Sequence, residues 1–504
     1  MRVLVTGGSG VIGAGLIPEL MACGHGVRLL ARGADDASRE WPEAVESFQA
    51  DVTAADQLIG AADACDAVVH ISGIVAERPP DITFERVNVD GTRNLLREAS
   101  RAGRPTFVFL SSLGADRGSS AYHKSKRDAE ALVREYDGHW IILRPGNVYG
   151  PGDEVISTLL SMQRTLPAIP MIGSGSHQFQ PIWYLDLGKA ISRAIERKVD
   201  RDVYEIAGDE ITSAHDLLDR FEQVTGRTPL RLPVPESIAA LTTRVAQATG
   251  VPFPINEAQF QMIVERNVIE PADNNALSRV FQVEATPLAR GLRMLADAQP
   301  EQQPAEGVGG LERKRFCADI TGSSFTAEEL MARFRQRFAE LMPIEFEAEP
   351  GALREVALGA TMTAAVPLRG NIQIRVEELT PRALTFATLR GHPLAGVVRF
   401  STSTPRPDVI RFATTVFARA ATVFDWVSLS SWGSVAQNST WRTVVERVIA
   451  ISGGTSDGVQ EQKEAVPDDE GGRVEEWIKD LIAGRKREAR AAPGSARPDT
   501  PNKA

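Results

Sequence analysis

The opening residues constrain the fold of this chain more than any other segment. Val3–Val5 is apolar and typical of a buried parallel strand, and TGGSGVIG (Thr6–Gly13) follows it directly. Beyond the glycines, Ile12, Leu16 and Leu20 repeat at helical spacing. A strand, a glycine turn and a helix in this order predict the start of an α/β sheet.

Three of the four glycines in this motif, Gly7, Gly10 and Gly13, have a physical role in such a turn. At Gly7 and Gly10 the missing side chains let an anion approach backbone N–H groups at the positive end of the helix. At Gly13 a side chain would hold the helix away from the strand. We therefore expect this turn to bind the pyrophosphate of a dinucleotide.

The size and composition of the chain limit the number of domains and the classes of protein to which it can belong. A chain of 504 residues is too long for one core and predicts two to three domains. The hydrophobic content of 43% is typical of a soluble protein, and a net charge of -10 disfavours a nucleic-acid surface. We find no apolar run long enough to cross a membrane, and the first strand leaves no room for a signal peptide.

The three cysteines lie far apart, without the spacing of metal ligands: Cys23, Cys65 and Cys317. They are interpreted as packing residues in a reducing cytoplasm. The sequence therefore predicts a cytoplasmic protein with no metal site.

Short apolar strands alternate with amphipathic helices as far as about Gly150, which predicts a doubly wound parallel sheet. The expected strands are Arg2–Val5, Val27–Ala31, Ser47–Ala50, Ala67–Ile71, Thr106–Leu110 and Trp140–Leu143, with helices that include Asp90–Ala102 and Ser125–Tyr136. Residues 151–297 are rich in proline and are interpreted as a helical substrate lobe of one domain, 1–297. Its apolar residues Met162, Met171, Phe179 and Trp183 are candidate pocket walls for an apolar ligand.

The C-terminal half has a different pattern. Residues 298–310, rich in Gln, Pro and Gly, predict a linker, and 311–454 predicts an α+β domain with an antiparallel sheet. Its expected strands are Thr361–Val366, Ile372–Leu379, Leu384–Leu389 and Val397–Ser401, followed by a helix at Ser439–Ile451. Residues 455–504 are expected to be disordered, except for a short helix at Arg473–Arg485.

A second set of residues carries chemistry. Tyr122 and Lys126 stand four residues apart in AYHKSK, and Ser111 and Ser112 end the preceding strand. Spacing of four puts both side chains on one helical face, where the ammonium can favour the phenolate. A serine hydroxyl could then hold a carbonyl oxygen while Tyr122 passes a proton and a nicotinamide passes hydride.

On these residues the segment Met1–Asp297 resembles the short-chain dehydrogenase/reductase superfamily, in its extended or atypical, epimerase/dehydratase-like branch. The resemblance implies Ser112, Tyr122 and Lys126 as the catalytic residues. It also implies a cofactor site made of Thr6, Gly7, Gly10, Val11, Ile12, Gly13, Arg32, Asp51, Val52, His70, Ser72, Gly73, Asn88, Ser111, Tyr122, Lys126, Pro145 and Val148. Asp186, in FQPIWYLDL, is interpreted as structural.

The choice of nicotinamide cofactor depends on the end of the second strand. An NAD enzyme usually has a carboxylate there for the ribose 2′-hydroxyl, whereas a 2′-phosphate prefers arginine. The sequence RLLARG has Ala31 at the acidic position and Arg32 next, which favours NADP over NAD. Asp35 or Asp36 reaching the ribose is the alternative.

Three functions remain open at this point. The first is an oxidoreductase acting on a carbonyl or alcohol, with a small and apolar substrate. The second is a non-catalytic NADPH-binding assembly or redox-sensing protein, because the short loop from Ser112 to Tyr122 resembles the group related to an accessory subunit of respiratory complex I. The third is a nucleotide-sugar epimerase or dehydratase. A homo-oligomer is compatible with each.

The C-terminal domain resembles a START-like helix-grip domain in two segments, Thr388–Thr402 and Arg411–Ala420. That fold implies a lipophilic pocket lined by aromatic residues such as Phe386, Phe400, Phe412, Phe417, Phe424 and Trp426. The alternative is that these residues fill a solid core, and that His392 is a hydrogen-bonded turn residue.

Overall fold

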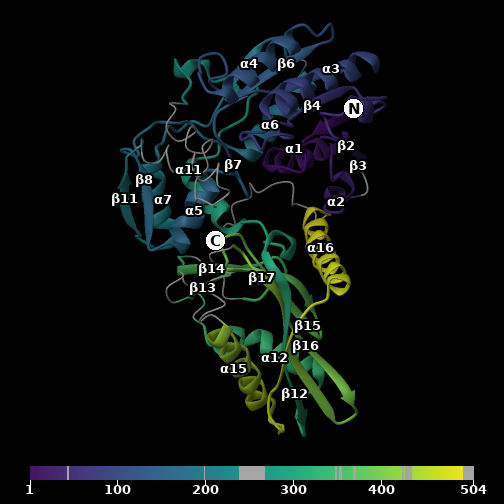
Figure 1. Cartoon of the computed structure of the whole chain (residues 1–504), viewed down its shortest axis with the longest axis vertical. Helices are drawn as coiled ribbons and strands as arrows, with labels where there is room; N and C mark the ends of the chain where they lie inside the picture. Colours follow the sequence, from purple (N-terminus) through teal and green to yellow (C-terminus); the bar gives the residue numbers. More distant parts are fainter. Residues whose placement is uncertain are drawn as a thin grey trace.

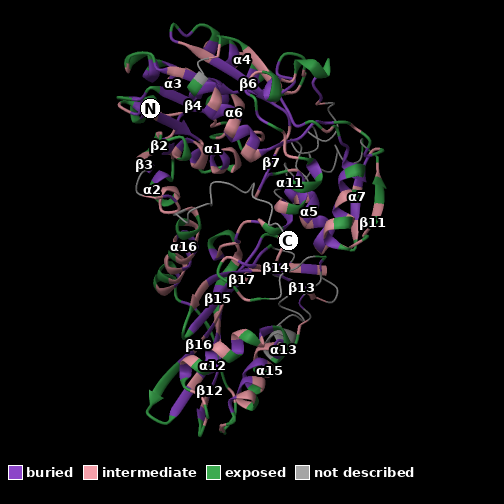
Figure 2. Ribbon diagram, turned by 180° about the vertical axis from the view of Figure 1, so that it is seen from behind, coloured by how far each residue is buried: buried purple, intermediate pink, exposed green. Residues whose placement is uncertain are grey.

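The computed structural model of the chain describes residues 1–491 apart from 43–44, 198, 236, 238–266, 345, 347–348, 351–354, 367–369, 423–424 and 426–433. A parallel sheet forms the core of the N-terminal half, and a separate antiparallel sheet forms the C-terminal half (Figure 1). Buried residues follow the strands of both sheets (Figure 2). The fold class predicted from the sequence is confirmed.

The N-terminal sheet has seven parallel strands in the order β10-β6-β5-β4-β1-β2-β3. They are β1 (Arg2–Thr6), β2 (Gly26–Ala31), β3 (Val45–Gln49), β4 (Ala67–His70), β5 (Thr106–Leu110), β6 (Trp140–Pro145) and β10 (Val203–Ile206). Strand order reverses between β1 and β4, the place where doubly wound sheets bind ligands. The sequence places β10 in the lobe, whereas it extends this sheet as a half-buried edge strand.

Helices cover both faces of this sheet. The apolar residues of α1 (Val11–Ala22) and α6 (Tyr184–Arg197) pack on one face, and those of α3 (Gly91–Arg101) and α4 (Ala121–Arg134) pack on the other. A Cβ on Gly15 would lie 2.4 Å from the carbonyl oxygen of Tyr184, so α1 and α6 can approach closely only with glycine there. The short α2 (Ala34–Ser38) follows β2, and a π-helical turn at Glu85–Asp90 leads into α3.

The lobe contains α5 (Ile156–Thr165), α7 (Ala214–Thr225) and α11 (Leu288–Asp297), with paired strands β7 (Val148–Tyr149) and β9 (Ile182–Trp183), and β8 (Ala168–Ile172) and β11 (Leu230–Val234). The short helix α10 (Ala276–Arg279) packs instead in the core of the parallel sheet. The expectation that Met162, Met171, Phe179 and Trp183 line a pocket is wrong. They are at most 7% exposed and form the lobe's own core, because α5 and α7 turn their apolar faces toward each other.

The C-terminal sheet is antiparallel, in the order β13-β14-β15-β16-β17-β12-β18. Its strands are β12 (Val308–Thr321), β13 (Thr361–Val366), β14 (Gly370–Thr380), β15 (Ala383–Thr388), β16 (Leu394–Arg406), β17 (Val409–Ala420) and β18 (Gln460–Ala465). Three helices, α12 (Ala327–Gln336), α13 (Phe338–Leu341) and α15 (Ser434–Ser452), lie on one face. On the opposite face lies α16 (Asp468–Ala491).

Phenylalanine rings fill the space between this sheet and α12. Phe386, Phe400 and Phe412 are fully buried, and the ring of Phe334 lies 4.9 Å from that of Phe400 and 5.2 Å from that of Phe412. These contacts favour the solid core over the lipophilic pocket. Phe417 instead faces Trp477 of α16, while Phe424 and Trp426 lie outside the described residues.

His392 lies in the turn between β15 and β16 and accepts a hydrogen bond from the backbone N–H of Leu394 at 3.0 Å. Burial lowers its pKa to about 4, so the ring is neutral at pH 7. It is a hydrogen-bonded turn residue.

Two boundaries from the sequence need correction. Within the expected linker, Gln299 and Glu301 are buried and β12 already begins at Val308. The tail expected to be disordered from residue 455 forms β18 and the helix α16 as far as Ala491. The helix is ordered because Ile478 and Ile482 pack against the sheet.

Buried polar contacts join the two halves of the chain. The guanidinium of Arg164 in α5 donates to both carboxylate oxygens of Glu349, at 2.9 and 2.8 Å, and to Gln373 of β14 at 2.8 Å. On the other side, α16 reaches the segment after α2, where Lys486 donates to Glu40 at 2.8 Å and Arg490 lies 3.5 Å from the centre of the Trp41 ring (Figure 1). Across the described part of the chain, helices are too short or too polar to traverse a lipid bilayer.

Candidate functional site

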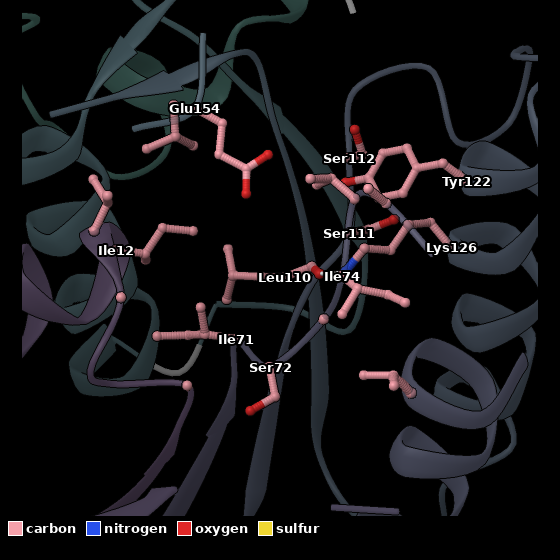
Figure 3. Close-up of a pocket in the computed structure, with 18 of the residues that line it drawn as sticks. Ile12, Ile71, Ser72, Ile74, Leu110, Ser111, Ser112, Tyr122, Lys126 and Glu154 are labelled. Carbon is pink, nitrogen blue, oxygen red and sulfur yellow. Dashed lines mark hydrogen bonds between the residues drawn. The ribbon is translucent and has the colours of Figure 1, made fainter. Parts of the chain in front are cut away.

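A cavity of about 1370 Å³ opens at the carboxyl ends of β1, β4 and β5. The glycine turn after β1 lines one side, Ser72 and Gly73 after β4 form the floor, and Ser111 and Ser112 after β5 line the other side (Figure 3). The cavity thus lies where the strand order reverses, and the predicted residues meet there because parallel strands end at one edge.

The glycine turn leaves a cradle of backbone. Gly7 has a φ of +70°, and a Cβ there would lie 2.8 Å from the backbone nitrogen of Ser72. A Cβ on Gly13 would lie 2.1 Å from the carbonyl oxygen of Gly8, so this glycine brings α1 onto the turn. The first turn of α1, with Val11 and Ile12, lines the cavity with backbone N–H groups that no helical carbonyl accepts. This cradle fits a pyrophosphate.

Arg32 and Gly33, after β2, and Asp51 and Val52, after the neighbouring strand β3, also line the cavity. The carboxylates that could compete with Arg32 are engaged elsewhere. Asp35 accepts a hydrogen bond from the hydroxyl of Ser47 at 2.7 Å, and Asp36 pairs with Arg39 at 3.5 Å and with Lys479 at 3.9 Å.

Tyr122 and Lys126 occupy the first two turns of α4. The helix begins there because the hydroxyl of Ser120 accepts from the backbone N–H of His123 at 3.1 Å. Lys126 is buried; its Nζ donates to the carbonyl of Leu110 at 2.9 Å and lies 5.1 Å from the centre of the Phe109 ring. Burial lowers the pKa of this ammonium to about 8, although Glu130 acts in the opposite direction.

The phenol of Tyr122 points toward Ser112 (Figure 3). Burial raises the pKa of this phenol, the hydrogen bond with Ser112 lowers it, and the charge of Glu154 raises it again. Because the net direction is upward, Tyr122 carries its proton at neutral pH in the protein alone.

Most of the predicted site residues line the cavity: Gly7, Gly10, Val11, Ile12, Arg32, Asp51, Val52, Ser72, Gly73, Ser111, Ser112, Tyr122, Lys126, Pro145 and Val148. Thr6, Gly13, His70 and Asn88 are buried behind its wall. His70 lies between the hydroxyls of Thr6, at 2.8 Å, and Thr92, at 3.0 Å, and burial lowers its pKa to about 3. It therefore supports the end of β4 as a neutral ring.

Asn88 braces the cavity from the π-helical turn. Its amide donates to the carbonyl of Ile74 at 3.1 Å and to Ser125 at 2.9 Å, while its oxygen accepts from the backbone N–H of Ile74 at 2.8 Å. These bonds tie the segment after β4 to α4.

Two acidic residues of the site were not predicted. Glu130 is fully buried and accepts from Ser111 at 2.5 Å and, through two bonds of 2.8 Å, from Arg144. Ser111 is therefore held by Glu130, while Ser112 faces Tyr122. The second residue, Glu154, extends its carboxylate into the cavity from the lobe. Its position after the segment Arg144–Gly152 was the available sequence signal.

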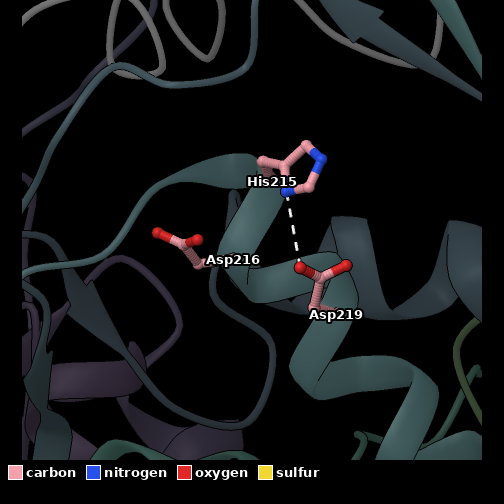
Figure 4. A group of neighbouring side chains, drawn as sticks. All are labelled: His215, Asp216 and Asp219. Carbon is pink, nitrogen blue, oxygen red and sulfur yellow. Dashed lines mark ion pairs between the residues drawn. The ribbon is translucent and has the colours of Figure 1, made fainter.

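His215, Asp216 and Asp219 form an exposed cluster on α7, away from the cavity (Figure 4). The guanidinium of Arg231 lies 3.4 Å from His215 and donates to Asp219 at 2.6 Å, and Asp216 accepts from the hydroxyl of Ser213 at 2.7 Å. Because Arg231 contacts His215 and Asp219, we interpret the three residues as part of a surface ion-pair cluster and assign no metal to them.

The N-terminal segment is similar to one protein family and to several known proteins. Residues 3–207 match the model of the "NAD dependent epimerase/dehydratase family". A "Ceramide reductase" from Caulobacter vibrioides is 34% identical over 176 residues, which are 34% of this chain and 55% of the relative. A "3 beta-hydroxysteroid dehydrogenase/Delta 5-->4-isomerase" from Mycobacterium tuberculosis is 33% identical over 183 residues, 31% of this chain and 49% of the relative. The chain thus spans about half the length of these two relatives.

A subunit of a respiratory complex is also similar, as the sequence predicts. Subunit 9 of the mitochondrial NADH dehydrogenase (ubiquinone) 1 alpha subcomplex of Arabidopsis thaliana is 24% identical over 276 residues, 53% of this chain and 68% of the relative. Among solved structures, UDP-glucose 4-epimerase of Thermus thermophilus, in complex with NAD, aligns with a TM-score of 0.46 and 22% identity, over 59% of this chain and 98% of that one.

Proposed function

We propose that the protein is an NADP-dependent oxidoreductase that interconverts a carbonyl and an alcohol, and the match of residues 3–207 to the NAD dependent epimerase/dehydratase family supports this proposal. The observation that carries the proposal is the shared cavity that joins the glycine cradle to Ser112, Tyr122 and Lys126. The cysteines are free thiols, which fits a cytoplasmic protein.

The residues of the cavity have distinct roles in this proposal. Ser112 and Tyr122 hold the substrate oxygen between their hydroxyl groups, and the ammonium of Lys126 stabilises the phenolate that remains after proton transfer. The glycine cradle and Arg32 would hold NADPH, which would supply the hydride that reduces the carbonyl carbon. Tyr122 gives its proton to the carbonyl oxygen, which completes the alcohol, and recovers a proton from solvent. Because burial raises the pKa of Tyr122, the phenol holds at neutral pH the proton that this transfer requires.

The residues that follow β2 support the preference for NADPH. Arg32 lines the wall where a 2′-phosphate would lie. Asp35 and Asp36 are bound to other partners, which favours Arg32 as the residue that meets this phosphate. We expect Arg32→Ala to weaken NADPH binding by about tenfold or more while NADH binding changes by less than about twofold, as measured by fluorescence titration.

The proposal is tested with NADPH that carries deuterium at both C4 positions. The purified protein is incubated with this cofactor and a panel of apolar ketones that includes octan-2-one, and the products are analysed by mass spectrometry. Transfer of deuterium to the product alcohol is expected. Tight NADPH binding without transfer to any ketone would favour an assembly or sensing protein. Epimerisation of a nucleotide sugar by the protein loaded with the oxidised cofactor, with no net reduction of that cofactor, would favour an epimerase.

A further inference from the structure

The segment that follows Arg32 has little core of its own. Arg32 lines the cavity, and residues 33–41, which we call the β2 arm, come directly after it and include α2. Within the β2 arm only Ala34 and Trp41 are buried. A segment with so few apolar contacts depends on contacts with other parts of the chain to keep one conformation.

The helix α16 of the C-terminal half lies beside the β2 arm and contacts it through charged side chains (Figures 1 and 2). Glu476 and Asp480 both accept hydrogen bonds from Arg39, the second at 3.4 Å. The ammonium of Lys479 lies 3.9 Å from the carboxylate of Asp36. These contacts hold the first half of the β2 arm and the residue that follows α2.

The last turns of α16 hold the end of the β2 arm. Lys486 donates to the carboxylate of Glu40 at 2.8 Å, and Arg490 donates to the backbone carbonyl of the same residue. The guanidinium of Arg490 also lies 3.5 Å from the centre of the Trp41 ring. The β2 arm is therefore held by α16 along most of its length.

The two faces of α16 contact different domains. The residues that contact the β2 arm repeat at steps of three or four or their multiples, and so share one helical face: Glu476, Lys479, Asp480, Lys486, Arg487 and Arg490. On the other face, Ile478 and Ile482 pack against the antiparallel sheet, and Arg485 donates to Glu377 of β14 at 2.7 Å. The C-terminal domain thus holds α16, and α16 holds the β2 arm.

This arrangement affects the affinity for a phosphate at Arg32. A guanidinium binds a phosphate through charge-assisted hydrogen bonds whose geometry is specific. When the adjoining segment is already ordered, binding does not have to provide the conformational entropy that ordering costs. A β2 arm held by α16 therefore favours binding of the 2′-phosphate.

We infer that α16 is a positioning element for the cofactor: by holding the β2 arm it keeps Arg32 where the 2′-phosphate of NADPH binds, so that the C-terminal domain determines the preference for NADPH over NADH. The inference rests on the proposed function, which assigns Arg32 to that phosphate. Because coupling between two sites is reciprocal, bound NADPH also stabilises the contact of α16 with the β2 arm.

The variant Ile482→Asn tests the inference without a change of charge. Ile482 is 2% exposed, and a buried amide without a partner there weakens the contact of α16 with the sheet. We expect NADPH affinity, measured by fluorescence titration of the full chain, to fall at least about fivefold, and NADH affinity to fall by less than about twofold. The matched control is Ala489→Asn, which places the same side chain at an exposed position of α16 and should keep both affinities.

A double variant tests whether the effect passes through Arg32. In the background of Arg32→Ala, the change Ile482→Asn should reduce NADPH affinity by no more than about twofold, because the contact that α16 positions is already absent. Losses that multiply in the double variant would overturn the inference. An equal loss of NADPH and NADH affinity in Ile482→Asn would also overturn it, because a merely structural role of α16 predicts that result.

Hydrogen exchange in the wild-type protein tests the reciprocal effect, independently of how well the variants fold. Saturating NADPH should slow amide exchange in residues 476–490 at least about fivefold, and saturating NADH less than about twofold. Equal protection by the two cofactors would overturn the inference.

The outcomes also separate this inference from the proposed function. A preference for NADPH that depends on Arg32 but survives Ile482→Asn would overturn the inference alone. A wild-type protein that binds NADH as tightly as NADPH would contradict the proposed cofactor and the inference together. A preference that depends on α16, in a protein that reduces no ketone, would contradict the proposed reaction alone.

Discussion

Burial of the Lys126 ammonium costs folding free energy, and the same ammonium has a role in the proposed reaction. Its ammonium is buried beside the Phe109 ring, and one backbone carbonyl, that of Leu110, replaces water as its hydrogen-bond partner. The lowered pKa of about 8 expresses that cost, because burial disfavours the charged form. A residue retained only for stability would not need a charge at this position.

The variant Lys126→Met tests this cost, because it removes the contribution of Lys126 to the pH dependence of stability. The folded pKa of about 8 lies below the ordinary value of 10.5, so between these pH values the unfolded chain binds a proton that the folded protein does not. Stability of the wild-type protein therefore rises with pH across this window. We expect the variant to melt about 3 °C above wild type at pH 7, the difference to fade by pH 10.5, and ketone reduction to be lost. A melting temperature below wild type at pH 7 would contradict the account.

Local patterns in the sequence predicted the elements that have strong apolar periodicity, and they missed elements that only tertiary contacts stabilise. The glycine turn and the pair Tyr122 and Lys126 were found because their spacing is local. Strand β18 has no apolar residue facing a core and forms only by pairing with β12. The role of Glu130 depends on Ser111 and Arg144, which lie on other elements, so no local pattern marks it.

The helix α16 packs against the sheet through a small apolar contact. Ile482 is 2% exposed, and Ile478 is 1% exposed, against Ala387 and Val397 of the sheet. We expect Ile482→Asp to release the helix, because an unpaired carboxylate would enter an apolar interface. Hydrogen exchange should then accelerate in α16 and in residues 34–41, which it contacts.

An exposed position on the same helix provides the control for this variant. The side chain of Arg473 is 76% exposed, so Arg473→Asp should leave exchange in residues 34–41 unchanged. Equal acceleration in both variants would show that α16 is not held by its apolar contact.

At the scale of the whole molecule, the antiparallel domain contacts the lobe beside the cavity. Arg390, in the turn between β15 and β16, donates to the carbonyl of Gly152 at 3.3 Å, two residues before Glu154. Arg164 and Glu349 form a buried ion pair between α5 and the C-terminal half, with side chains 4% and 6% exposed. The position of the lobe is thus linked to the second domain.

Arg164→Met should destabilise the protein by about 3–5 kcal/mol, because it leaves the Glu349 carboxylate buried without its cation. Calorimetric melting measures the loss. The matched control is Arg382→Met, which breaks the exposed pair with Glu328 and should leave the melting temperature close to that of wild type. Similar losses in the two variants would show that the buried pair does not join the domains energetically.

The most direct test of the proposed hydride transfer is the rate of ketone reduction by Tyr122→Phe, measured together with its NADPH affinity. The substitution removes one oxygen from the cavity and leaves the glycine cradle unchanged. We expect kcat to fall by about 10²–10⁴-fold, with the Kd for NADPH within about twofold of wild type. A variant that reduces the ketone at the wild-type rate would contradict the assignment of Tyr122 as the proton donor.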